Sequence, residues 1–301
     1  MAKLIVTGGA GFIGSHLTDK LIALGHEVIV VDNLMLGKKE FINKKAKFYK
    51  KDIRDYKGLK KIFKGADAVF HLAADPRLPI SIKDPLTTND INVNGTLNVL
   101  WAAKQNKVAK VIFSSSCAIY GDQQMLPIKE SVALKPLTPY GLHKLIGEEY
   151  CCLFSSLYNL PTVCLRYFNV FGSRKLATGG YPMVIPIFLE QKKKGEKLTV
   201  VGDGKSTRDY VHVSDVVEAN VLAWTQNKVN DGSPINVGSG KQTSVNEIAA
   251  LIGGDVVNIT ERLGEMRFIE ADNGLAQSVL GWKPKVGVEA GIAQLKKEMG
   301  L

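Results

Sequence analysis

The chain has 301 residues, of which 45% are hydrophobic and 23% are charged, and it carries a net charge of +10. This length suits one large domain or a domain with a smaller lobe, and the composition is ordinary for a globular protein. No apolar run reaches the roughly 18 residues that a membrane-spanning helix needs. The beginning runs directly into a strand pattern and lacks the features of a signal peptide, so we expect a cytoplasmic protein.

Most of the positive charge comes from lysines spread along the chain, because only seven of the 39 basic residues are arginines. A nucleic-acid-binding protein would concentrate its basic residues on one face or in a recognised module, so we expect no nucleic-acid partner. The cysteines are Cys117, Cys151, Cys152 and Cys164. They form neither a CxxC pair nor a metal-ligand pattern with histidine. We therefore expect free thiols, a reducing compartment and no metal site.

Short apolar runs alternate with helical stretches through the first half of the chain. In order, the pattern predicts a strand at 4–6, a helix at 14–24, strands at 27–31, 47–49 and 68–72, a helix at 93–104, a strand at 110–114, a helix at 140–157 and a strand at 162–166. Continuously apolar strands are typical of a sheet that is covered on both faces, and the alternation indicates a parallel sheet. The predicted fold class is α/β, with a Rossmann-type doubly wound parallel sheet.

The pattern changes after residue 168. A glycine-containing loop at 172–182 precedes a helix at 183–195, a strand at 198–201 and a helix at 213–224. We expect the C-terminal third to form a smaller α+β lobe that covers the sheet edge and binds the substrate. The predicted division places residues 1–168 and about 209–239 in a dinucleotide-binding domain, and about 169–208 and 240–301 in the lobe.

A glycine-rich segment at 8–14, GGAGFIG, contains the pattern GxGxxG. It follows a predicted strand and opens a predicted helix, which is the context that indicates dinucleotide binding. Glycines let the backbone approach a pyrophosphate closely, and the helix N-terminus offers amide donors to the phosphates. The cofactor-binding residues predicted here are Gly8, Gly11, Phe12, Ile13 and Gly14.

Acidic residues follow the next two strands. Asp32 closes the second strand, where a carboxylate accepts hydrogen bonds from the adenosine ribose. Its charge would repel a 2′-phosphate, so the sequence predicts NAD rather than NADP. Asp52 and Ile53 follow the third strand and are placed to flank the adenine.

Tyr140 and Lys144 lie at positions i and i+4 of a predicted helix and therefore share a face. A free tyrosine has a pKa of about 10, and a neighbouring cation lowers it toward a value suited to proton transfer. Ser114, Ser115 and Ser116 end a strand, at the edge where parallel sheets bind ligands. These residues predict redox chemistry in which Tyr140 is the acid–base group and Ser116 binds the reacting oxygen.

Together these motifs resemble the extended short-chain dehydrogenase/reductase family over nearly the whole chain. The matching segments are TGGAGFIG at 7–14, VDNL at 31–34, DIRD at 52–55, HLAA at 71–74, NVNGT at 92–96, SSSCAIYGD at 114–122, PYGLHK at 139–144, RYFNVFG at 166–172, RDYVHVSD at 208–215 and GWKP at 281–284. Within the family, the motifs are most similar to those of UDP-glucose 4-epimerases and allied NAD-dependent nucleotide-sugar epimerases. The resemblance implies NAD as cofactor, a UDP-sugar as substrate and a homodimer.

The resemblance also implies roles for the matching residues. Tyr140 would take the proton of the sugar O4 while C4 gives hydride to NAD, and the 4-keto sugar would accept hydride back on its other face. Lys144 would bind the nicotinamide ribose, and Ser116 would assist at O4. Further cofactor-binding residues would be Asn33, Leu72, Ala73, Ala74, Asn92, Ser114 and Tyr167. Substrate-binding residues would be Asn169, Arg208 and Arg262 at the diphosphate and Ile269 at the position that gates N-acetyl sugars.

The chain departs from the family pattern at three places. His143 stands where a small residue is usual, Pro76-Arg77 stand where bacterial 4-epimerases carry a lysine, and Ile269 is neither the bulky tyrosine of strict enzymes nor the small residue of permissive ones. His71 and His212 belong to the matching motifs, and we expect both to have structural roles.

Alternative activities within the family differ at one tripeptide. Ser116-Cys117-Ala118 lacks the acidic residues that the family's dehydratases and decarboxylases carry there, which favours 4-epimerisation of a UDP-sugar. N-acetylhexosamine 4-epimerisation, reduction and 3,5-epimerisation stay open. A non-catalytic dinucleotide-binding protein is also an alternative, although such relatives typically lose the Tyr or the Lys that this chain keeps.

Overall fold

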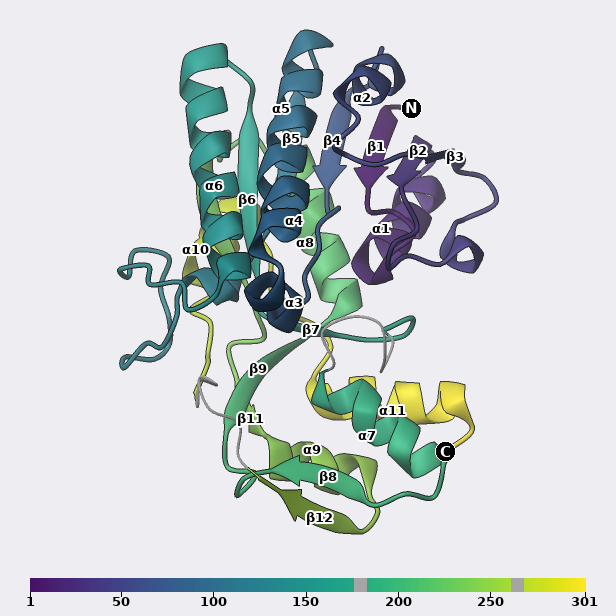
Figure 1. The fold of residues 1–301 in the computed structure, drawn as a ribbon, viewed down its shortest axis with the longest axis vertical. Helices are drawn as coiled ribbons and strands as arrows, with labels where there is room; N and C mark the ends of the chain where they lie inside the picture. The colour runs from purple at the N-terminus through teal and green to yellow at the C-terminus, as the bar shows by residue number, and fades with distance from the viewer. Residues whose placement is uncertain (176–182, 261–267) are drawn as a thin grey trace.

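A computed structural model describes residues 1–175, 183–260 and 268–301. Within these ranges the core is a seven-stranded parallel sheet in the order β10-β6-β5-β4-β1-β2-β3 (Figure 1). Its strands are β1 (Lys3–Thr7), β2 (Glu27–Asp32), β3 (Lys47–Lys50), β4 (Ala68–His71), β5 (Lys110–Ser116), β6 (Thr162–Tyr167) and β10 (Asp231–Val237). The strand order reverses between β1 and β4, so the predicted doubly wound sheet is confirmed, and the reversal marks the usual ligand-binding crevice.

Helices cover both faces of this sheet. One face carries α1 (Phe12–Ala23) and α8 (Val213–Thr225), and the other carries α2 (Tyr56–Ile62), α5 (Gly95–Gln105) and α6 (Pro139–Tyr158). Side chains along a strand alternate between faces, so Leu4 and Val6 pack toward α1 and α8 whereas Ile5 packs toward α2 and α5. In Figure 1, α5 and α6 lie side by side in front of the sheet and α8 lies behind it.

A smaller α+β lobe is built from two further sheets, β11-β9-β7 and β12-β8. The bounds are β7 (Asn169–Phe171), α7 (Val184–Lys193), β8 (Leu198–Val201), β9 (Thr207–His212), β11 (Gln242–Ser244), α9 (Val245–Ile252), β12 (Val256–Ile259) and α11 (Val288–Met299). These elements share a core around Phe171, Phe188 and Ile248. The position of each domain boundary stays a prediction.

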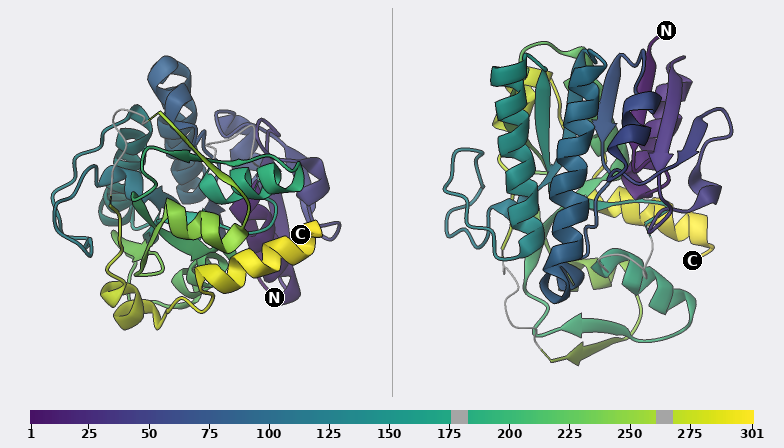
Figure 2. Two further views of the ribbon diagram at one scale, coloured as in Figure 1. Left: turned by 90° about the horizontal axis from the view of Figure 1, so that it is seen from below. Right: turned by 45° about the horizontal axis from the view of Figure 1, so that its top comes forward.

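The lobe lies elsewhere than expected. The sequence predicted that it covers the sheet edge, but it lies below the carboxyl ends of the parallel strands (Figure 2, right). Of the described elements in the C-terminal third, α10 (Gly274–Leu280) packs beside the edge strand β10. The expectation was wrong because it did not include β10. This strand comes late in the chain, adds to the sheet and itself forms that edge. The lobe therefore faces the end of the sheet where the loops predicted to bind ligands emerge.

Short helical segments complete the described structure. They are η1 (Lys39–Phe41), α3 (Leu78–Lys83), α4 (Pro85–Asn89), the π-helical turn η2 (Asp90–Asn94) and η3 (Cys117–Ile119). Among the described residues, no helix combines the length and the apolar character needed to cross a membrane.

Candidate active site

A cleft of about 740 Å³ opens at the carboxyl ends of the parallel strands, and residues of the smaller lobe line its other side. Nearly all residues singled out from the sequence line it: Gly8, Gly11, Phe12, Ile13, Gly14, Asp32, Asn33, Asp52, Ile53, Leu72, Ala73, Ala74, Ser114, Ser116, Tyr140, Lys144, Tyr167, Asn169, Arg208 and Ile269. Asn92 is buried behind the cleft, and Arg262 lies outside the described residues. The cleft therefore brings together segments from five strands and both parts of the molecule.

The glycine-rich loop between β1 and α1 is packed too tightly for side chains. A Cβ on Gly8, whose φ is +74°, would lie 2.7 Å from the Ala73 backbone nitrogen, and a Cβ on Gly14 would meet the Gly8 carbonyl oxygen. Helix α1 begins after Gly11 without a capping side chain. Its first amides are thus left for a ligand, and a helix N-terminus of this kind suits phosphate oxygens.

Asp32 ties this loop to the end of β2. Its carboxylate accepts hydrogen bonds from the backbone nitrogens of Ala10 at 3.0 Å and Leu34 at 2.7 Å. Burial raises the pKa of Asp32, and these two hydrogen bonds oppose that rise. A carboxylate has about four acceptor positions, so Asp32 keeps the capacity to accept from ribose hydroxyls while it shapes the loop.

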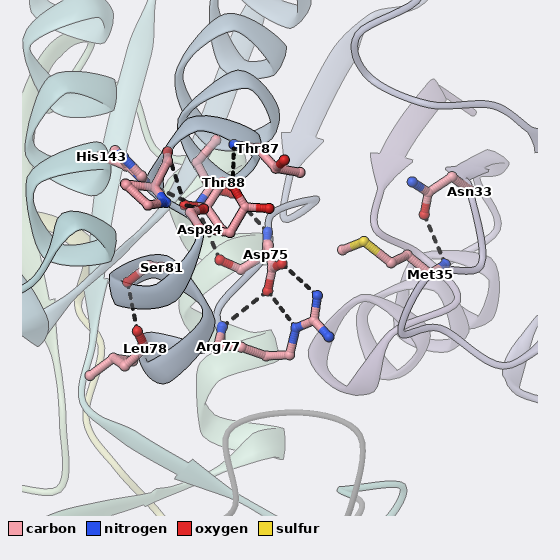
Figure 3. Close-up of polar contacts among 12 residues, drawn as sticks. Asn33, Met35, Asp75, Arg77, Leu78, Ser81, Asp84, Thr87, Thr88 and His143 are labelled. Atoms are coloured by element: carbon pink, nitrogen blue, oxygen red, sulfur yellow. Dashed lines mark hydrogen bonds and ion pairs between the residues drawn. The ribbon is translucent and has the colours of Figure 1, made fainter.

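Asp52 and Asn33 are joined on the same side of the cleft. The Asn33 amide donates to the Asp52 carboxylate at 2.9 Å, and Arg54 holds the pKa of that carboxyl well below its usual range. Asn33 also accepts from the Met35 backbone nitrogen at 2.9 Å, which Figure 3 shows. These contacts order the loop after β2 that borders the cleft.

Tyr140 and Lys144 lie on the first turns of α6. Thr138 caps this helix by accepting from the Gly141 nitrogen, and Pro139 is its first residue, a position that proline favours. The Lys144 ammonium donates to the Ser114 carbonyl oxygen at 2.6 Å and lies 5.9 Å from the centre of the Tyr140 ring. Tyr140 and Ser116 line the same cleft, and the Ser116 hydroxyl acts to lower the pKa of Tyr140. The predicted catalytic residues are therefore brought together.

Burial dominates the electrostatics of this group. It raises the pKa of Tyr140 above the usual value, an effect that the Ser116 hydroxyl opposes, and it lowers the pKa of Lys144 to about 8. The sequence predicted that Lys144 would bring the pKa of Tyr140 down. In the protein alone the opposite shift prevails, because removing the phenolate from water is the largest contribution to the pKa of Tyr140.

Asn92 acts from behind the cleft. It lies on the π-helical turn, where its amide oxygen accepts from the Asp75 nitrogen at 2.7 Å and its amide nitrogen donates to the Asp75 carbonyl at 3.0 Å. The Asp75 carboxylate in turn holds Arg77 through two bonds of 2.7 and 2.8 Å, as Figure 3 shows. Asn92 also lies 3.4 Å from the ring of His143, which is buried. Asn92 thus fixes the loop that brings Arg77 into the cleft.

The lobe contributes single side chains to the other side. Asn169 begins β7 and donates to the Asp209 carbonyl at 3.3 Å, and Arg208 lies on the adjacent strand β9. Ile269 is buried against Tyr120, Ile128 and Phe168. Its segment is held by the Asp209 carboxylate, which accepts from the nitrogen of Ala271 at 3.0 Å.

Four basic residues of the cleft lining were not included among the predicted site residues. They are Lys51, Arg77, Arg174 and Lys175. Arg174 is paired with Asp19 of α1 at 2.7 Å, and burial lowers the pKa of Lys175 to about 8. The scarcity of arginine in this Lys-rich chain was an available signal for two of them, and Arg174 follows the RYFNVFG segment closely.

The residues expected to be structural have structural contacts. The fully buried His71 lies 2.7 Å from the Thr7 hydroxyl and 3.0 Å from the Thr96 hydroxyl. His212 contacts the Ser214 hydroxyl at 2.8 Å. The four cysteines are free, as predicted.

Known proteins with this sequence pattern share the fold. Residues 4–238 match the model of the NAD dependent epimerase/dehydratase family. The UDP-glucose 4-epimerase of Mycolicibacterium smegmatis is 38% identical over 306 residues, covering 97% of this chain and 96% of that protein. The crystal structure of Thermotoga maritima UDP-glucose 4-epimerase with UDP-glucose is 39% identical, with a TM-score of 0.94 and 99% of both chains covered. The UDP-N-acetylglucosamine 4-epimerase of Methanobrevibacter ruminantium, in complex with UDP-N-acetylmuramic acid, is 35% identical, with a TM-score of 0.92 and 99% of both chains covered.

Proposed function

Because the chain belongs to the NAD-dependent epimerase/dehydratase family, we propose that it interconverts UDP-glucose and UDP-galactose by inverting C4 of the sugar. One observation carries the proposal: Tyr140, Ser116 and Lys144 meet in the cleft that also holds the glycine-rich loop. The tripeptide Ser116-Cys117-Ala118 at this point contains no carboxylate. The site thus has an acid–base pair for one hydroxyl, and this tripeptide supplies no additional acid for elimination or decarboxylation.

The residues around the loop fit NAD. The close-packed glycines and the uncapped start of α1 suit the pyrophosphate, and Asp32 suits the ribose hydroxyls of NAD better than a 2′-phosphate. Bound NAD supplies a hydride acceptor for C4, and in its reduced form a donor. Lys144 is placed to bind the nicotinamide ribose, as the family resemblance implies.

The chemistry of the chain's own residues is then proton transfer at O4. Ser116 and Tyr140 bind the 4-hydroxyl, and Tyr140 takes its proton when C4 is oxidised to the ketone. Tyr140 returns the proton when the 4-keto sugar is reduced on its opposite face. Protonated Lys144 favours the phenolate form of Tyr140, and a buried site strengthens that interaction.

The lobe holds the nucleotide half of the substrate in this proposal. Asn169 and Arg208 would contact the diphosphate, and arginine is suited to such charge-assisted contacts. Arg262 keeps the same proposed role. Ile269 would lie against the sugar, where its branched side chain limits the space for an N-acetyl group.

The main alternative is 4-epimerisation of N-acetylated UDP-sugars. The Methanobrevibacter enzyme named above, of nearly the same fold and 35% identity, supports it. Purified protein incubated with UDP-glucose, UDP-galactose and their N-acetyl forms separates the two. We expect conversion of the first pair without added cofactor and weaker conversion of the second. Activity on the N-acetyl pair alone would establish the alternative, and consumption of added NADPH would indicate a reductase.

We further propose a cytoplasmic homodimer formed through α5 and α6. Leu142, Leu153 and Leu157 are exposed on α6, and α5 lies beside that helix (Figure 1). Exposed apolar side chains in one area are typical of an interaction surface. Light scattering at micromolar concentration should report twice the chain mass, and a monomer would contradict this assembly.

A further inference from the structure

Glu148 and Arg166 form a buried ion pair directly behind the proposed catalytic residues. The Arg166 Nε and Nη2 atoms lie 2.9 and 2.7 Å from the two carboxylate oxygens of Glu148, and the side chains are only 3% and 4% exposed. Removing two charges from water is costly, so a pair of this kind adds little stability compared with apolar side chains of similar shape. Neither residue takes part in the proposed chemistry, and stability alone is a weak explanation for them.

Glu148 belongs to a stripe of three residues on α6. Tyr140, Lys144 and Glu148 are spaced by four residues and therefore share one face of the helix. Each is matched by one of the last three residues of β5. Lys144 donates to the Ser114 carbonyl and Glu148 accepts from the Ser115 hydroxyl, while Tyr140 shares the cleft with Ser116, whose hydroxyl acts to lower its pKa. Glu148 is thus the third residue in a series whose first two are the proposed catalytic ones.

Two adjacent strands hold the Glu148 carboxylate. Ser115 of β5 and Arg166 of β6 are register partners in the sheet, and both bind the same carboxylate. Gly147 lets the helix approach closely, because a Cβ there would collide with the Phe113 ring of β5. The depth of α6 against the sheet is therefore set at this point.

The other end of Arg166 reaches toward the lobe. Its Nη1 atom donates to the Tyr120 hydroxyl at 2.9 Å, and that hydroxyl donates to the amide oxygen of Asn236 on β10. The Asn236 amide nitrogen donates to the Ile128 carbonyl at 2.8 Å. A continuous series of hydrogen bonds thus connects Glu148 on α6 with the loop that contains Ile128.

That loop pairs with the segment that contains Ile269. The Ile128 nitrogen donates to the Glu270 carbonyl at 2.8 Å, and the Asp272 nitrogen donates to the Ile128 carbonyl at 2.9 Å. Buried side-chain networks that are fully satisfied rigidify their surroundings. The segment that contains Ile269 and the helix that bears Tyr140 are therefore held in a fixed position relative to each other.

We propose that Glu148 is a positioning residue: together with Arg166 it fixes the Tyr140-bearing helix against the Ser116-bearing strand and, through Tyr120 and Asn236, relative to Ile269. This inference rests on the proposed function for the reacting groups and adds to it a residue that touches neither substrate nor cofactor. Displacing reacting groups by about 1 Å can cost about 100-fold in rate. Apart from Lys144 at the nicotinamide ribose, the proposed contacts to NAD and to the nucleotide come from residues outside α6, so a loss of positioning should reduce kcat and leave KM and NAD content nearly unchanged.

A double variant, Glu148→Leu with Arg166→Met, tests the proposal because it replaces the pair by apolar side chains and leaves no unpaired buried charge. We expect a melting temperature and NAD content close to wild type, an unchanged KM and a kcat lowered about 10- to 100-fold. A folded, NAD-containing variant with wild-type kcat would overturn the positioning role alone. A wild type inactive on every UDP-sugar would overturn the proposed function and this inference with it.

A milder pair of variants gives a result even if the double variant fails to fold. Ser115→Ala removes one contact to Glu148 and keeps the ion pair. Thr162→Val is its matched control, because the Thr162 hydroxyl also joins the sheet to α6, through the Cys151 carbonyl at 2.8 Å, at a point farther along the helix from Tyr140. We expect kcat to fall severalfold in Ser115→Ala and to stay unchanged in Thr162→Val. Equal kcat values in the two variants would contradict the proposal.

Discussion

The two sides of the cleft are built differently. On the cofactor side, short loops that directly follow parallel strands line the cleft, and much of their contribution is backbone, as at Gly8, Gly14 and Ala73. On the lobe side, side chains such as Asn169, Arg208 and Ile269, which are far apart in the chain, contribute to the lining. Close approach of the backbone to a ligand requires glycines at fixed spacing, which form a motif that can be recognised in the sequence. A contact made by one side chain requires only a single residue, which has no such motif.

The two sides also differ in how they are held. The cofactor side is continuous with the buried sheet, so its geometry follows from strand packing around residues such as Val6 and Phe70. The lobe side has a separate core around Phe171 and Phe188, and the Asp209 carboxylate fixes the segment near Ile269 by binding the nitrogens of Gly240 and Ala271. We therefore expect changes on the cofactor side to affect binding of NAD and the chemistry, and changes on the lobe side to affect the choice of sugar.

The largest effect is expected from Tyr140→Phe. Removing the acid–base hydroxyl should lower kcat by about 10²- to 10⁴-fold, while the ring still fills its buried position. NAD content, measured by absorbance after extraction, should stay close to that of wild type. A variant that retains full activity would contradict the assignment of Tyr140.

The next largest effect is expected from Gly14→Ala, which tests whether the cofactor side depends on backbone approach. The added Cβ would meet the Gly8 carbonyl oxygen and lie 2.9 Å from the Gly9 Cα. Overpacking of this kind costs roughly 1–3 kcal/mol, which corresponds to about 5- to 150-fold weaker NAD binding in a fluorescence titration. Asn169→Ala is the control from the lobe side and should weaken UDP binding alone. If both variants bind NAD equally weakly, NAD binding does not depend on the cofactor side alone, and the expected division of roles between the two sides is wrong.

The pH dependence of kcat tests the electrostatics of α6. Lys144 has a pKa lowered by burial to about 8, so it is protonated below pH 8 and loses its charge above it. Because the charged form supports Tyr140, kcat should fall above pH 8, by about tenfold at pH 9 if the charge is essential. Deprotonation of Tyr140 would act in the opposite direction and raise the rate with pH. In Lys144→Arg, whose side chain stays charged, any remaining activity should persist at high pH.

Local patterns predicted the fold of the first half of the chain well. The strands, and helices such as α1 and α6, begin and end within two residues of their predicted positions, because their apolar runs and caps are local signals. The strand β10 and the helices α9 and α11 were not individually predicted. The residues of β10 include Gly232 and Pro234, which interrupt the apolar pattern typical of a strand. The place of β10 at the sheet edge depends on pairing with β6, which is far away in the sequence.

In the candidate site too, local motifs could be predicted from the sequence and features that depend on long-range packing could not. The residues of the glycine-rich loop, Tyr140 and Lys144 could be predicted because each belongs to a spaced motif. Arg77 could not be assigned, because its place in the cleft depends on the buried Asp75 and on Asn92 from a π-helical turn. The pKa of Tyr140 was predicted in the wrong direction, because burial depends on the packing of the whole site.

The smallest effect is expected from Ile269, and it bears most directly on the lobe side. An N-acetyl group adds several heavy atoms at the sugar C2, and the pocket must hold them in both orientations of the 4-keto sugar. Ile269 lacks the ring and hydroxyl of a tyrosine, yet its β-branched side chain is stiff, and Tyr120, Ile128 and Phe168 confine it. One misfitted apolar contact in a pocket is worth about tenfold at the lower end of its range. Ile269→Gly should therefore raise the ratio of N-acetylated to plain UDP-sugar turnover by up to about tenfold, and Ile269→Tyr should abolish the N-acetyl activity while sparing UDP-galactose. NAD content serves as the control and should be equal in all three proteins. If neither change moves the ratio, Ile269 is not the gate, and the choice of sugar is made elsewhere on the lobe side.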